Sequence, residues 1–462
     1  MSAGRHGASA RVESRRHLIW ALASTPAVLF GCGVAARDSP TGDSRPSITG
    51  HWEGELVREG ARLPVSFDFS TGPTGVAGTF TSLTQRAMEY PLDKVAIAGR
   101  TVHFTLGEGS LAFDGRLEGE SLAGKLREED APGEFALRRV RPSPQPYDRE
   151  DVTFRNGDAT LSGSLFIPRT KGAHPAIVFL HGSGPEIRLG TSRFYADRFA
   201  RVGIAALIYD KRGAGASTGD WQRSTFEDLA DDAIAAIRLL QRREDIDSRR
   251  IGLYGHSQGG LIAPLAASRA PDAVAFLVAA ASFPDSVWQQ DIYRIGQSIR
   301  KQNFSEDEVA RAMGVYRLFI DVARGARSWD ELEAASTPVR NERWYKWLGI
   351  PPREHWLWTY YRGTGNFRAL PAWERIGVPV LLVYGERDQL VPVGESIHKI
   401  EGALHRAGNQ TYAAIIVPRA AHNLTVTPEP GEPFDWWRAA PGVTNLLTAW
   451  VLHQTRVAQS QQ

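Results

Sequence analysis

The sequence predicts a doubly wound, mostly parallel α/β sheet with a helical cap insertion, preceded by a small all-β domain. At 462 residues the chain is too long for a single hydrophobic core, so at least two folded units are expected. Over residues 151–455, short apolar runs alternate with amphipathic helical patterns, which is typical of parallel strands covered by helices on both faces. Residues 46–140 instead alternate between apolar and polar side chains, which is the period of half-buried strands.

The all-β prediction depends on segments such as 65–69 and 102–106, in which Val, Phe and Leu alternate with polar residues. Glycine-bearing breaks recur between such runs at the spacing of an antiparallel meander. We therefore expect a β-barrel or β-sandwich over residues 46–140. Its opening, Gly50-His51-Trp52-Glu53-Gly54, resembles the start of a lipocalin-like barrel. No polar cluster in this domain resembles a site, which favours a folded spacer over a ligand-binding module.

A proline-rich connection separates the two predicted units. Proline alternates with other residues over 141–146, which favours an extended linker, and we place this linker at residues 141–150. Beyond it, residues 225–241 place their apolar side chains on one face of a helix. The expected strands are the apolar runs 176–180, 205–209, 251–254, 274–278, 380–384 and 412–417.

A Gly-x-Ser-x-Gly motif occupies residues 255–259, between the strand-like run 251–254 and a helix-compatible segment. In this strand-turn-helix context the serine lies on a strained turn that lifts its hydroxyl above the edge of the sheet. Gly255 and Gly259 leave room for the neighbouring strand and helix to approach each other. The motif therefore indicates Ser257 as a nucleophile.

A serine hydroxyl is a poor nucleophile near neutral pH, so this interpretation requires a base and an orienting acid, in the chain order serine, acid, histidine. Glu386 and Asp388 both lie on the loop after the late strand 380–384, and both are candidate acids. His422 closely follows the last strand-like run and is the candidate base. All three components of a catalytic triad are therefore present in the required order.

Together these motifs resemble those of the α/β-hydrolase superfamily, over residues 150–455. The chain is most similar to the serine aminopeptidase-like and carboxylesterase-like branch, in which exported bacterial esterases often carry an N-terminal β-domain. The resemblance implies that His422 is the general base. It also implies that Asp388, rather than Glu386, is the acid, because Gly-x-x-Asp-x-x-Val-Pro matches the acid loop of the family. Related dehalogenases and epoxide hydrolases carry aspartate where this chain has Ser257, so acyl transfer is expected.

The first strand of the α/β unit ends in His181-Gly182-Ser183-Gly184, which resembles the oxyanion loop of esterases and lipases. The resemblance implies that the backbone N–H groups of Ser183 and Gln258 stabilise the oxyanion. We expect His181 to hold the loop by hydrogen bonding rather than to act in catalysis. The glycine-rich segment 210–217 lacks the ending of a phosphate-binding loop and is expected only to shape the site.

Between residues 283 and 373 the strand–helix alternation stops, and the sequence becomes helical and rich in aromatic residues. Ser305 and Glu308 form a capping box at the start of one such helix. We interpret this segment as an inserted cap. Its tryptophans could line an apolar substrate pocket, but packing of the cap helices is the more common role of such residues. They are Trp329, Trp344, Trp347, Trp356, Trp358 and Trp373.

Composition excludes several classes of partner. Lys+Arg 54 against Asp+Glu 52 leaves a net charge of +2, and no basic residues cluster as nucleic-acid binding requires. The single cysteine excludes an internal disulfide and a zinc site built on paired thiolates. We therefore expect no nucleic acid, no metal and no cofactor.

Residues 1–36 are expected to form an export signal. Arginines precede the apolar run 18–30, which is too short to span a bilayer. The segment 14–19 resembles a twin-arginine export motif, and Leu29-Phe30-Gly31-Cys32 resembles a bacterial lipobox, whose cysteine is acylated after cleavage. Secretion with simple cleavage after Ala36 is the alternative. The mature protein is expected in the periplasm or attached to a membrane through lipidated Cys32.

These observations predict a serine hydrolase that cleaves carboxylic esters through an acyl-enzyme intermediate. The substrate would be a small-molecule ester or, in the alternative of a peptidase or amidase, a short peptide. A binding protein without catalysis is the third alternative, and the triad argues against it. The cap pocket would separate an esterase from a peptidase, for instance through an acid that binds the amino terminus of a peptide, and the cap contains Asp330, Glu331, Glu333 and Glu342.

Overall fold

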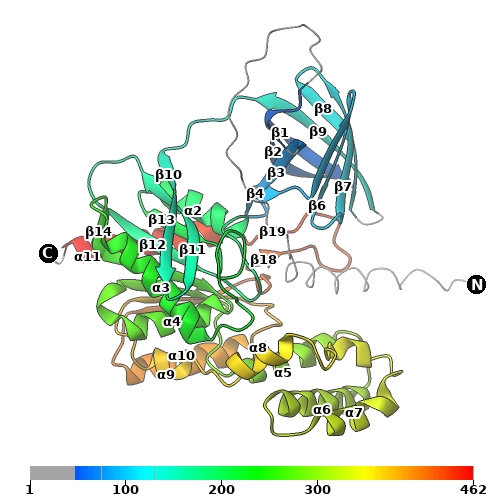
Figure 1. Ribbon diagram of the computed structural model, residues 1–462, viewed down its shortest axis with the longest axis vertical. Coiled ribbons are helices and arrows are strands. Elements are labelled where there is room, and N and C mark those ends of the chain that lie inside the picture. Colours follow the sequence, from blue (N-terminus) through cyan, green and yellow to red (C-terminus); the bar gives the residue numbers. More distant parts are fainter. Residues whose placement is uncertain (1–46, 74, 129–130, 461–462) are drawn as a thin grey trace, which may run out of the picture.

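The computed structural model describes residues 47–460, apart from residues 74, 129 and 130, and contains two large sheets with separate cores (Figure 1). The predicted export signal and Cys32 lie outside the described residues. Within the described part of the chain, no helix combines the length and the apolar character needed to cross a bilayer.

The first sheet is antiparallel throughout and curls into a half-barrel, in agreement with the predicted all-β domain. Its inward side chains alternate along each strand, and Phe67, Phe104 and Phe113 meet in the core with ring centroids 4.5–5.6 Å apart. The strand order is β4-β3-β2-β1-β9-β8-β7-β6-β5. The strands are β1 (Gly50–Arg58), β2 (Ala61–Gly72), β3 (Gly75–Ser82), β4 (Ala87–Pro91), β5 (Lys94–Ala98), β6 (Thr101–Leu106), β7 (Leu111–Glu118), β8 (Ser121–Glu128) and β9 (Ala131–Val140).

The second sheet confirms the predicted mostly parallel α/β architecture. Its order is β10-β11-β13-β12-β14-β15-β16-β17, in which β11 pairs antiparallel with both β10 and β13 and all other neighbours pair in parallel. β10 begins at Tyr147, inside the range 141–150 assigned to the linker. The strands are β10 (Tyr147–Asn156), β11 (Ala159–Pro168), β12 (His174–Leu180), β13 (Ala205–Tyr209), β14 (Ile246–His256), β15 (Phe276–Ala280), β16 (Val380–Gly385) and β17 (Tyr412–Val417).

Helices cover both faces of this sheet. Apolar side chains of α2 (Thr191–Arg201) and α11 (Val443–Ser460) share one core with the sheet, and those of α3 (Phe226–Gln241), α4 (Gly259–Arg269) and α10 (Val393–Arg406) share the other. α3 lies where the helical pattern predicted it, and Thr225 caps it by accepting the backbone N–H of Asp228 at 3.1 Å. The doubly wound arrangement is therefore confirmed.

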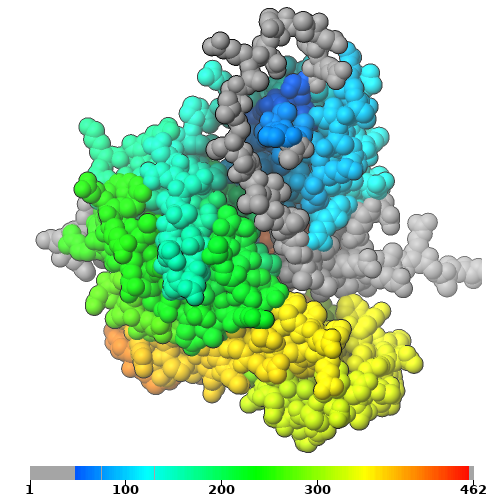
Figure 2. Space-filling model, in the orientation of Figure 1, coloured from blue at the N-terminus to red at the C-terminus, as the bar shows by residue number. Residues whose placement is uncertain are grey.

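The cap is inserted between β15 and β16 and lies against the lower side of the α/β domain in Figure 2. Ser305 and Glu308 form the predicted capping box. Five of the six tryptophans named above pack against the hydrophobic core: Trp344, Trp358 and Trp373 are buried, and Trp329 and Trp347 are partly buried. The cap helices are α5 (Val287–Arg300), α6 (Glu306–Ala323), α7 (Trp329–Ser336), α8 (Leu357–Thr364) and α9 (Leu370–Trp373).

After β17 the chain forms a short antiparallel pair, β18 (Thr425–Val426) and β19 (Arg438–Ala439). This pair lies beside the β3–β4 turn, at the edge of the first sheet (Figure 1). The backbone N–H of Ala439 donates to the carbonyl oxygen of Thr84 in the β3–β4 turn at 2.8 Å. The C-terminal part of the chain therefore contacts the N-terminal domain directly.

Candidate active site

Ser257 lies on the sharp turn between β14 and α4. Its φ is +54°, which is rare for a residue with a side chain and is the strained conformation that the motif predicts. The backbone N–H of Ser257 donates to the carbonyl oxygen of Ala280 at 2.9 Å. A Cβ at Gly255 would lie 2.0 Å from the carbonyl oxygen of Gly259, and a Cβ at Gly259 would lie 2.7 Å from that of Leu180. Glycine is therefore required on both sides of the serine.

His422 and Asp388 meet at the same end of the sheet. Nδ1 of His422 lies 2.8 Å from Oδ2 of Asp388, and both side chains are buried. The other carboxylate oxygen of Asp388, Oδ1, accepts the backbone N–H groups of Leu390 at 2.8 Å and Val391 at 3.0 Å. The turn after β16 therefore fixes this carboxylate so that Oδ2 is left for the histidine.

The alternative acid, Glu386, is exposed and has a different partner. Its Oε2 accepts the backbone N–H of Arg419 at 2.8 Å, on the outer side of the loop that leads to His422. The structure therefore brings Asp388, and not Glu386, to the imidazole of His422.

His256, the residue before Ser257, connects two segments of the site. One is the turn that carries Ser257, residues 255–259 (the nucleophile turn), and the other is the loop that carries His422, residues 418–424 (the histidine loop). Nε2 of His256 donates to the carbonyl oxygen of His422 at 3.1 Å, and the two rings lie 5.0 Å apart. Burial, with the nearby His422, lowers the pKa of His256 to about 3, so this imidazole is neutral near pH 7. Among the described residues Ser257 Oγ makes no hydrogen bond, and catalytic contacts of this kind often tighten only when substrate is bound.

The loop after β12 presents Ser183, and α4 begins next to Gln258, so their backbone N–H groups are the two expected oxyanion donors. Within the described residues neither N–H donates to another protein atom. Lys211 joins the two segments. Its Nζ donates to the carbonyl oxygens of Gly182 at 2.7 Å and Gly184 at 3.1 Å, and to Oε1 of Gln258 at 2.6 Å.

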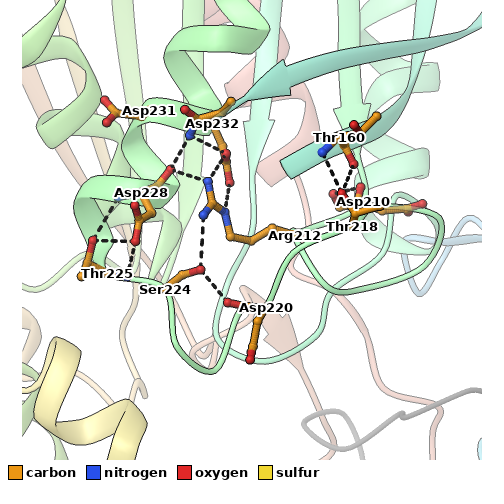
Figure 3. A network of polar contacts seen from close by, with 12 residues as sticks. Thr160, Asp210, Arg212, Thr218, Asp220, Ser224, Thr225, Asp228, Asp231 and Asp232 are labelled. Atoms are coloured by element: carbon orange, nitrogen blue, oxygen red, sulfur yellow. Dashed lines mark hydrogen bonds and ion pairs between the residues drawn. The ribbon is translucent and has the colours of Figure 1, made fainter. Parts of the chain in front are cut away.

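Lys211 was not predicted, because its motif indicated only a loop that shapes the site. It is 2% exposed, and burial lowers its pKa to about 8. Its neighbour Arg212 anchors the loop, since its guanidinium donates to both carboxylate oxygens of Asp232 on α3 at 2.6 and 2.7 Å (Figure 3). His181 Nε2 donates to the carbonyl oxygen of Tyr209 at 2.5 Å, which is the hydrogen bond expected to hold the loop after β12 in place.

Residues 171–429, more than half of the chain, match the family described as serine aminopeptidase, S33. The chain belongs to this family. Among characterised relatives, the esterase EstD of Thermotoga maritima is 27% identical over 205 residues, which cover 43% of this chain and 48% of EstD. The quorum-quenching protein AidA of Acinetobacter baumannii is 36% identical over 111 residues, which cover 24% of this chain and 36% of AidA. The chain thus spans half or less of the length of these relatives.

Among solved structures, Est1E from Butyrivibrio proteoclasticus overlaps 67% of this S33-family chain and 99% of its own chain, at 15% identity and a TM-score of 0.41.

On the cap side of this S33-family site, aromatic residues lie next to the nucleophile turn. Nε2 of Gln258 donates to the hydroxyl of Tyr360 on α8 at 2.7 Å. The rings of Trp221 and Trp356 pack edge to face at 4.9 Å, and Trp221 lies 6.2 Å from Tyr360. All three side chains are half-buried. Trp356 is therefore the predicted cap tryptophan that these contacts connect to the site.

The acids of the cap have partners on the cap surface. Glu331 pairs with Arg327 at 2.7 Å, Glu333 with Arg340 at 2.6 Å and Glu342 with Arg311 at 3.0 Å, and Asp330 is exposed. Three of the four predicted acids are therefore paired with arginines of the cap.

Proposed function

We propose that this chain is a serine hydrolase that cleaves carboxylic esters through Ser257, His422 and Asp388. The observation that carries the proposal is the pairing of His422 Nδ1 with a carboxylate that two backbone N–H groups hold in place, next to a serine in a left-handed turn. The name of the relative EstD, an esterase, supports ester hydrolysis.

In the first half of the reaction, Ser257 Oγ attacks the carbonyl carbon of the ester, while Nε2 of His422 accepts the hydroxyl proton. Asp388 accepts the Nδ1–H of His422, which keeps Nε2 unprotonated before attack and stabilises the imidazolium afterwards. As the carbon–oxygen bond of the ester breaks, His422 returns the proton to the departing alkoxide. The products are an alcohol and an acyl-enzyme on Ser257.

In the second half, His422 removes a proton from water as the water oxygen attacks the acyl carbon, and the proton then passes to Ser257 Oγ when the acid is released. Each attack places negative charge on the carbonyl oxygen. The N–H groups of Ser183 and Gln258 would stabilise that charge, and Lys211 fixes both segments that carry them.

A peptidase of the serine aminopeptidase type is the second candidate, and the family of the chain favours it. The same triad could cleave an amide. Three of the four predicted cap acids, however, pair with arginines of the cap, so these residues do not offer a free carboxylate to a peptide amino terminus. We therefore favour ester substrates.

The test of the proposal combines labelling with two substrate series. A fluorophosphonate probe should label Ser257, and Ser257→Ala should abolish labelling and reduce turnover by about 10⁶, the loss known for such a nucleophile in subtilisin. A p-nitrophenyl ester series and an aminoacyl-anilide series are then compared on the wild-type protein. Labelling that persists in Ser257→Ala would refute the nucleophile, and faster hydrolysis of the anilides would refute the preference for esters.

A further inference from the structure

The β-domain contacts the loop that carries His422 through one buried arginine. Arg86 lies in the β3–β4 turn and is 4% exposed. Its Nη2 donates to the carbonyl oxygen of Asn423 and, at 3.2 Å, to that of Leu424, and its Nη1 donates to the hydroxyl of Tyr195 at 2.5 Å. One guanidinium of the N-terminal domain therefore holds the two residues that follow the histidine.

The histidine loop depends on such outside contacts for its conformation. Leu424 has φ +55° and Arg419 has φ +59°, and a residue with a side chain in this region costs about 1–3 kcal/mol, so the surroundings must impose the conformation. Three consecutive carbonyl groups, at 422–424, are held from outside the loop. His256 holds the first, and Arg86 holds the other two.

The chain after the histidine loop also enters the β-domain. Between β18 and β19, Phe434 and Trp436 pack into the core of the half-barrel, where Trp436 is 5% exposed. Nε1 of Trp436 donates to the carbonyl oxygen of Ala61 at 3.3 Å, and the guanidinium of Arg58 lies 4.2 Å from the ring centroid of Phe434. The chain that follows His422 is thus fastened to the β-domain at two places, residues 423–424 and residues 434–436.

We infer that the β-domain completes the active site, with Arg86 as a positioning residue that sets the place of His422 relative to Ser257. The inference rests on the proposed role of His422 as general base. A general base must lie within hydrogen-bond reach of the proton that it removes, and a displacement of about 1 Å can cost about 10²-fold in rate. Because Arg86 contacts the loop of His422 through backbone carbonyl groups and not through the imidazole, its loss should reduce kcat and leave KM close to the wild-type value.

The test uses the full chain with Arg86→Met, which keeps the apolar stem and removes the donors, and Arg86→Lys, which retains one charged donor. Arg116→Met is the matched control, because Arg116 is exposed on β7 and, among the described residues, forms its ion pair with Glu118 of the same strand. The measurements are kcat and KM for a p-nitrophenyl ester, the rate of fluorophosphonate labelling of Ser257, and the unfolding midpoint.

We expect Arg86→Met to lower kcat and the labelling rate together by about 10²-fold, Arg86→Lys to lie between it and the wild type, and Arg116→Met to match the wild type. If Arg86→Met does not fold, Arg86→Lys decides the question with the same measurements. If Arg86 only fastened the two domains, the folded variants would lose stability but keep the wild-type labelling rate, and this result would overturn the inference. Activity that survives His422→Ala would instead refute the proposed function.

Discussion

Replacing Asp388 by Asn should disable the enzyme through the tautomer of His422, and the structure shows why. Two backbone N–H groups, those of Leu390 and Val391, donate to Oδ1 of Asp388. In Asp388→Asn only the amide oxygen can accept both of them, so the amide NH₂ must face Nδ1 of His422. Nδ1 then accepts a hydrogen bond, which places the imidazole proton on Nε2, the atom that has to take the proton of Ser257.

The comparable change in a serine protease triad lowers kcat about 10⁴-fold, equal to about 5 kcal/mol of transition-state free energy, and we expect a loss of that order here. Glu386→Gln is the matched control, since Glu386 is exposed and accepts the backbone N–H of Arg419 rather than a contact from His422. The assay is steady-state hydrolysis of p-nitrophenyl acetate, with circular dichroism to confirm that each variant is folded. A folded Asp388→Asn variant with near wild-type kcat, or a Glu386→Gln variant that is the more impaired, would refute the reasoning.

Two further predictions concern the buried basic residues around the site. Lys211→Met should lower kcat by up to about 10²-fold with little change in KM, because the oxyanion loop and Gln258 lose the donor that they share. The control is Lys171→Met, which changes an exposed lysine and should have no effect. Equal kcat values for the two variants would contradict this role of Lys211. His181 has its pKa lowered by burial to about 3, so between pH 6.5 and 3 the unfolded chain binds a proton that the folded chain excludes, and stability falls as the pH falls. Urea unfolding at pH 7 and pH 5 should show that His181→Gln reduces the stability difference between these pH values by about 2 kcal/mol, and an unchanged difference would show that His181 is not buried in its neutral form.

The periodicity of the chain was sufficient to predict both fold classes, because a strand buried on one face or on both leaves its pattern directly in the residue order. The predicted runs at 205–209 and 412–417 coincide with β13 and β17. β10 was not predicted. It is an edge strand that carries mostly polar residues and is exposed along much of its length, so it has no apolar run, and its first residues were assigned to the linker.

The sequence by itself determined the candidate nucleophile, because a strained turn needs glycines at fixed neighbouring positions and so is visible locally. It left Glu386 and Asp388 as alternatives that were separated by a resemblance and by the shorter side chain of aspartate, whereas the folded chain places Asp388, and not Glu386, beside His422. The tertiary structure also decided the contacts of Lys211 and Arg86. Each of these two side chains joins segments that are distant in the chain by donating to backbone carbonyl groups. A carbonyl acceptor belongs to the backbone, so no side chain marks its position in the sequence.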